Sequence, residues 1–74
     1  MPLHLPTPLV ASDPFGTPAQ RVWLKLECLQ PSGSFKLRGV GHACEAHAAR
    51  GAQRLLSSSG GNAGIAVAYA GQRL

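Results

Sequence analysis

Apolar and polar side chains alternate along residues 21–27, which is the pattern of a strand with one buried face. The apolar positions are Val22, Leu24 and Leu26, and the intervening positions are Trp23, Lys25 and Glu27. This period of two predicts a β-strand over the whole range. The first 20 residues contain five prolines, which are incompatible with a regular helix, and residues 7–10 fit a short extended or edge segment.

Between residues 34 and 50 the apolar positions change to a helical period. One stripe is formed by Leu37, Val40, Gly41, Cys44 and Ala48, and the opposite face is marked by Arg38, His42, Glu45 and Ala49. We expect Ser34 to cap the start of this helix and Gly51 to end it. His42 and His47 are interpreted as surface or boundary residues and not as ligands.

A short second strand over residues 54–57 and a helix over residues 65–74 follow. The helix is apolar or small on most sides, which is typical of a buried helix, and one face carries Ala63, Ala66, Val67, Ala70 and Leu74. The order strand, helix, strand, helix predicts an α/β fold with a parallel strand pair and a right-handed crossover. Because these elements do not complete a sheet, we expect residues 1–74 to be the N-terminal part of a larger protein.

Seven Lys and Arg residues against three Asp and Glu residues give a net charge of +4. The basic residues are scattered with few aromatic residues between them, which favours a solvated surface or affinity for a small anion over nucleic-acid binding. No stretch approaches the roughly 20 apolar residues of a membrane span. Cys28 and Cys44 form no CxxC pair, which indicates reduced thiols in the cytoplasm, and the cysteines and histidines lack the spacing of zinc ligands.

The first motif with chemical content is residues 31–39, Pro-Ser-Gly-Ser-Phe-Lys-Leu-Arg-Gly. A turn set by proline and glycine leads into the helix, so Lys36 lies in the first helical turn. A lysine is normally disfavoured at this positive end of the helix dipole, unless its amine is wanted neutral. A neutral amine is a nucleophile that forms a Schiff base with a carbonyl, although an ordinary solvated lysine is the more common interpretation of such a residue alone.

The second motif is residues 57–64, Ser-Ser-Ser-Gly-Gly-Asn-Ala-Gly, between the second strand and the second helix. Its glycines allow close approach of the backbone to a ligand, and its hydroxyls and free helix amides suit an anion. The sequence is neither a P-loop nor a dinucleotide fingerprint. Because ligands bind at the carboxyl ends of strands in α/β sheets, we expect this motif to face the same crevice as Lys36.

Taken together, the two motifs resemble the N-terminal part of the L-serine/L-threonine dehydratases. These are pyridoxal-phosphate enzymes of fold type II, the tryptophan-synthase β-like fold, and the resemblance covers most of the chain from about Val22 onward. The element Ser-Phe-Lys-x-Arg-Gly is shared with threonine deaminases, whereas the doubled glycine before Asn62 is more similar to serine dehydratase. Cysteine synthases carry a Lys-Asp-Arg element and a Thr-Ser-Gly-Asn loop, neither of which occurs here.

The resemblance implies a role for each motif residue. Lys36 would form the Schiff base with pyridoxal 5'-phosphate and act as the catalytic base, Phe35 would lie against the pyridine ring, and Asn62 would bond the 3′-oxygen. The substrate carboxylate would be held by the loop residues Ser59, Gly60, Gly61 and Ala63. The implied reaction is β-elimination from an amino acid that yields a 2-oxo acid and ammonia. The resemblance is compatible with a homodimeric full-length protein.

Several alternatives stay open at this point. Within the same fold they are threonine synthase, an amino-acid racemase or a β-replacement enzyme, which residues after 74 would separate. In other classes they are a non-catalytic anion- or nucleotide-binding module and a small basic nucleic-acid binder. Residues 1–74 alone are expected to be inactive, because the phosphate loop and the residue at the pyridine nitrogen are not in this chain.

Overall fold

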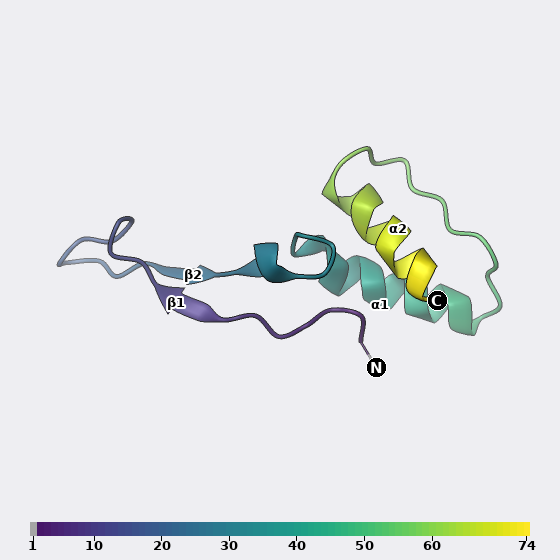
Figure 1. Cartoon of the computed structure of the whole chain (residues 1–74), viewed down its shortest axis with the longest axis horizontal. Helices are drawn as coiled ribbons and strands as arrows, with labels where there is room; N and C mark the ends of the chain where they lie inside the picture. The colour runs from purple at the N-terminus through teal and green to yellow at the C-terminus, as the bar shows by residue number, and fades with distance from the viewer. Residues whose placement is uncertain (1) are drawn as a thin grey trace.

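The computed structural model describes residues 2–74, which form a long β-hairpin arm joined to a pair of helices (Figure 1). The elements are β1 (Leu9–Ala11), β2 (Trp23–Lys25), the 3-10 helix η1 (Glu27–Leu29), α1 (Lys36–Ala49) and α2 (Asn62–Arg73). The radius of gyration is 15.5 Å, whereas a compact domain of this length would have about 11 Å. The described chain is therefore elongated, and most of its apolar burial lies at the helical end. Within residues 2–74 no helix combines the length and apolar character needed to cross a membrane.

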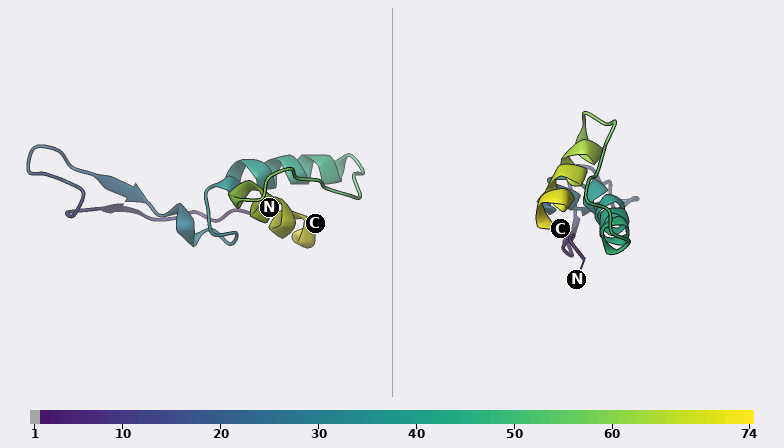
Figure 2. Two further views of the ribbon diagram at one scale, coloured as in Figure 1. Left: turned by 90° about the horizontal axis from the view of Figure 1, so that it is seen from above. Right: turned by 90° about the vertical axis from the view of Figure 1, so that its right-hand side faces the viewer.

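The core lies where α1 and α2 pack side by side. Leu37 is the largest fully buried side chain, and Cys44, Ala66 and Ala70 complete the buried apolar set. Small side chains at these positions let the two helices approach closely. The two views in Figure 2 and the view in Figure 1 agree that the helices run in the same general direction, with their N-terminal ends together. The apolar stripe predicted for residues 34–50 is confirmed, because its central members are buried.

The end of α1 follows its sequence signal, whereas the start does not. The helix begins at Lys36, two residues after the predicted start, and Phe35, not Ser34, occupies the N-cap position without a side-chain cap hydrogen bond. The Lys36 amide donates to the Ser34 hydroxyl at 3.4 Å. At the other end Gly51 has a φ of 97°, a left-handed conformation that glycine adopts without strain. The amides of Gly51 and Ala52 donate to the carbonyls of Ala48 and His47, respectively, which satisfies the last turn.

The arm is an antiparallel hairpin. Leu9 pairs with Lys25, Val10 with Leu24, and Ala11 with Trp23. The strand predicted for residues 21–27 is confirmed in its centre only, since Glu27 belongs to η1. The predicted alternation holds, with Val22, Leu24 and Leu26 half-buried and Trp23 exposed. The proline-rich start supplies the partner strand, as expected for an extended edge segment.

The parallel strand pair is not confirmed. Residues 54–57 have no strand partner in the described part of the chain, and the Leu56 side chain is 99% exposed. A strand exists only when a neighbour takes up its backbone donors and acceptors. Within residues 2–74 the sheet consists of β1 and β2. These strands form a hairpin and run antiparallel, because the loop between them reverses the direction of the chain. The observed order is therefore hairpin, helix, loop, helix.

The second helix is confirmed, but it begins at Asn62, three residues before the predicted start. Its buried face carries Ala66 and Ala70, as the sequence pattern indicates. The interpretation of a helix buried on most sides is wrong for residues 2–74, because Ile65 and Leu74 are more than half exposed. The physical reason is that α1 is the one element that packs on it in the described chain.

Candidate active site

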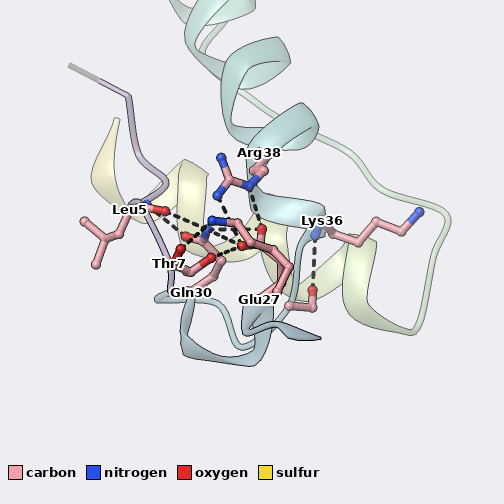
Figure 3. Close-up of polar contacts among 8 residues, drawn as sticks. Leu5, Thr7, Glu27, Gln30, Lys36 and Arg38 are labelled. Carbon is pink, nitrogen blue, oxygen red and sulfur yellow. Dashed lines mark hydrogen bonds and ion pairs between the residues drawn. The ribbon is translucent and has the colours of Figure 1, made fainter. Parts of the chain in front are cut away.

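Lys36 is the first residue of α1, and its side chain is exposed. Its Nζ lies 5.2 Å from the centroid of the Phe35 ring, which is itself 57% exposed. Figure 3 shows the Lys36 side chain pointing away from the polar cluster around Glu27. The structure therefore presents an accessible amine beside an accessible aromatic face at the positive end of a helix, as the first motif predicts.

The same helical turn is held from the other side by an ion pair. Arg38 Nε and Nη2 donate to the two carboxylate oxygens of Glu27 at 2.5 and 3.1 Å. The Glu27 carboxylate also accepts from the Thr7 hydroxyl and, at 3.3 Å, from Gln30 Nε2 (Figure 3). This fork geometry is the strong form of an Arg–carboxylate pair. It ties η1 and the N-terminal segment to the start of α1.

Glu27 should make the stability of this region depend on pH. The hydrogen bond from Arg38, followed by that from Thr7, lowers the pKa of Glu27 from 4.5 to about 2. Because the folded-state pKa is depressed, the stabilisation is fully present above 4.5 and is lost as the pH falls through about 2. We expect Glu27→Gln to lower the melting temperature at about pH 6, and the difference from the wild type to shrink progressively toward about pH 2. A difference that stayed constant over this range would contradict the assignment.

The N-terminal segment crosses the face of α1 that lies opposite its apolar stripe. Gln30 is buried, and its side-chain amide exchanges two hydrogen bonds of 2.8 Å with the backbone of Leu5. The Leu3 amide donates to Glu45 Oε1 at 3.2 Å. Arg38 and Glu45, which the sequence pattern places opposite the apolar stripe, are half-buried. His42 and His47 are exposed, as predicted.

The second motif forms a tight loop that leads into α2. The Ser59 amide donates to the Ser57 hydroxyl at 3.2 Å, and the Gly61 amide donates to the Ser59 hydroxyl at 3.1 Å. A Cβ at Gly64 would lie 2.2 Å from the Ser59 carbonyl oxygen, so this position has room for glycine alone. By contrast, a Cβ at Gly60 would meet nothing within 4 Å, so the backbone there is open to a ligand.

The predicted site residues lie at the end of the helix pair that adjoins the hairpin arm, and no cavity closes around them (Figure 1). Ser59, Gly60, Gly61 and Asn62 are exposed, and Ala63 is half-buried. Both helix N-termini lie at this end (Figure 2), where their dipoles favour an anion. The hollow along the loop is lined by Ser57, Ser59, Gly60, Gly61, Gly64 and α2 side chains, and Lys36 is not among its lining residues. One shared crevice stays a prediction.

The profile of a family described as pyridoxal-phosphate dependent enzyme matches residues 1–74, the whole of the chain. The chain belongs to this family. It is 53% identical over 74 residues to a Homo sapiens protein named serine dehydratase-like, which covers 99% of this chain and 22% of that protein. It is 49% identical over 77 residues to L-serine dehydratase/L-threonine deaminase of Bos taurus. This match covers 99% of this chain and 23% of the Bos taurus protein.

A less similar relative matches the chain over the same extent. The L-serine dehydratase of Dictyostelium discoideum is 45% identical over 82 residues, which covers 99% of this chain and 23% of that protein. The chain thus spans between a fifth and a quarter of the length of these relatives, at 22–23%. Its membership of the pyridoxal-phosphate dependent enzymes agrees with the resemblance of the two sequence motifs.

The chemistry of the exposed groups fits pyridoxal phosphate, the cofactor of this family. Its aldehyde requires an amine, its ring an apolar face, and its oxygen atoms hydrogen-bond donors. Lys36, Phe35 and Asn62 supply groups of these kinds at solvent-accessible positions. The open backbone beside Gly60 leaves space for a polar ligand near the start of α2. Residues 2–74 place no three His, Cys, Asp or Glu side chains together as a metal site.

The polar contacts that hold the Lys36 turn were missed by sequence reasoning. The sequence pattern places Glu27 in a strand and predicts no role for Gln30. Neither residue has a spacing that marks it as a partner of Arg38 or of the N-terminal backbone. The Ser32 hydroxyl is buried and has no hydrogen-bond partner in the described chain, which no sequence signal indicates. The one sequence signal for these contacts is a glutamate and a glutamine after a strand, followed by an arginine at the start of a helix. This signal is too common to identify the contacts.

Proposed function

We propose that this chain is the N-terminal part of a pyridoxal-phosphate-dependent L-serine (or L-threonine) ammonia-lyase. The reaction converts the hydroxy amino acid to a 2-oxo acid and ammonia. The observation that carries this proposal is the full-length match of the chain, at 45–53% identity, to proteins named serine dehydratases. The geometry supports it, because the motif lysine is exposed at a helix start and the serine-glycine loop lies at the same end.

In this proposal Lys36 Nζ holds the cofactor, and the exposed Phe35 ring covers one face of its pyridine ring. Asn62, in the first turn of α2, donates a hydrogen bond from its side-chain amide to a cofactor oxygen. The substrate carboxylate is held by the Ser59 hydroxyl and by backbone amides of Gly60, Gly61 and Ala63. The support for these roles is the accessibility of the side chains and the open backbone at Gly60.

When bound, the cofactor supplies an electron-withdrawing ring that stabilises negative charge at the substrate Cα. The work of the protein is to orient the amino acid and to move one proton. The loop amides fix the carboxylate, which turns the Cα–H bond toward Lys36. Lys36 Nζ accepts the Cα proton, and the β-hydroxyl takes up a proton and leaves as water. Cβ then takes up a proton, and a water molecule adds at Cα as ammonia leaves, which yields the 2-oxo acid.

The proposal extends to the surroundings of the site. In the full-length protein residues 54–57 pair as a parallel strand with chain outside residues 1–74, which would cover the exposed Leu56. The thiols of Cys28 and Cys44 are free, which supports a reducing compartment such as the cytoplasm.

Purified full-length protein loaded with pyridoxal phosphate tests the activity directly. We expect release of ammonia and a 2-oxo acid in equal amounts from L-serine or L-threonine. A matched incubation with D-serine serves as the control for stereochemistry. Loss of optical activity without ammonia would indicate a racemase, and product formation only with an added nucleophile would indicate a β-replacement enzyme. Either result would overturn the proposed reaction while leaving the family intact.

A further inference from the structure

Lys36 and Arg38 lie on opposite sides of the first turn of α1. Two residues along an α-helix are separated by about 200° around the axis. Figure 3 shows this arrangement, with Arg38 directed into the cluster around Glu27 and Lys36 directed away from it. A constraint on Arg38 therefore acts on the rotation of the same turn that presents Lys36.

The constraint on Arg38 is firm because its partner is itself held. Glu27 is 15% exposed in its side chain, Arg38 is 39% exposed, and the pair is joined through two hydrogen bonds. Partial shielding from water and bidentate geometry distinguish this pair from an ordinary surface ion pair. The Thr7 hydroxyl and the Gln30 amide fix the Glu27 carboxylate from two further segments.

Few other contacts hold this turn. Among residues 36–39 Leu37 is the one buried residue, and the Lys36 amide donates to the Ser34 hydroxyl at 3.4 Å. A small rotation of the turn about the helix axis would move the Lys36 amine. A rotation of about 20° carries an atom about 8 Å from the axis by roughly 3 Å. A displacement of about 1 Å at a reacting group can cost about 100-fold in rate.

We propose that the Glu27–Arg38 ion pair is a positioning pair that fixes the rotation of the first turn of α1, and thereby the direction in which Lys36 presents its amine. This inference rests on the proposed role of Lys36 in holding the cofactor. Neither residue touches the reacting atoms. Glu27 acts through Arg38, and Arg38 acts through the helix backbone.

The test is a double-mutant cycle in the full-length protein with Glu27→Gln, Arg38→Met and the double variant. We expect each single variant to weaken pyridoxal-phosphate binding about tenfold and to lower kcat with little change in KM. The double variant should be no worse than either single variant, because both remove the same contact. Arg38→Lys should recover part of the affinity through its charge alone.

Two measurements separate positioning from general stability. Glu45→Ala removes the bond to the Leu3 amide on the same helix but far from its first turn. It should lower the melting temperature and leave cofactor affinity within about twofold. In cofactor-free protein, hydrogen exchange should accelerate in the first turn of α1 in Glu27→Gln and stay unchanged in α2.

The outcomes are distinct. If the pair variants only lowered the melting temperature, as Glu45→Ala does, and kept cofactor affinity and first-turn exchange, the positioning role would be overturned. If the wild type bound no pyridoxal phosphate, the proposed function would fail. The exchange measurement, which needs no cofactor, would then still decide whether the pair orders this turn.

Discussion

Replacing Lys36 with alanine is expected to abolish cofactor attachment and to reduce ammonia release from L-serine by at least about 1,000-fold. The reason is that the same amine holds the cofactor and moves the Cα proton, so its removal eliminates two functions at once. In the full-length protein, borohydride reduction followed by peptide mass spectrometry should place the pyridoxyl group on the peptide that contains Lys36. The visible absorption band of the bound cofactor should be absent from the variant.

The matched control is the other lysine of the chain. Lys25 lies on β2, and its Nζ donates to the Thr7 carbonyl, so its charge is engaged in the arm and not in the site. Lys25→Ala should retain the trapped adduct on Lys36 and most of the activity. An adduct on Lys25 or on a lysine outside residues 1–74, with Lys36 unmodified, would remove the basis of the proposed mechanism.

The helices of this chain were predictable because their signals are local. Gly51 ends α1 in a left-handed conformation, as its residue type indicates, and the helix begins at Lys36, two residues after the start predicted from Ser34. Leu37 and Cys44 are buried because the period of 3.6 places them on the stripe that meets α2. The position of Lys36 in the first turn follows from the same signals, so the candidate site was predictable to that extent.

The strands were less predictable because pairing depends on distant segments. The apolar pattern at residues 54–57 carries no information on whether a neighbouring strand is present, and residues 2–74 contain none for it. β1 pairs with β2 because the loop between them brings the two strands side by side. The Glu27–Arg38 contact likewise arises from the path of the chain through η1, which a sequence period cannot reveal.

Gly64→Ala should destabilise the loop of residues 57–64, although intrinsic propensity predicts the opposite. Alanine is favoured over glycine in a helix by about 1 kcal/mol. The new Cβ would, however, lie 2.2 Å from the Ser59 carbonyl oxygen, a backbone atom that cannot move without shifting the loop. Overpacking of this kind costs about 1–3 kcal/mol, so the clash should win. Equilibrium denaturation of the full-length protein gives the sign directly.

The functional consequence should exceed the loss of stability. Relief of the clash would move Ser59, break its hydroxyl bond to the Gly61 amide and displace Asn62 at the start of α2. We expect KM for L-serine to rise at least tenfold, because the proposed carboxylate contacts depend on this loop. Gly60→Ala is the stability control, since its Cβ would meet nothing within 4 Å and its φ is not positive. If Gly64→Ala were as stable as Gly60→Ala and kept the wild-type KM for L-serine, the close approach of Gly64 to the Ser59 carbonyl would have no role in shaping the site.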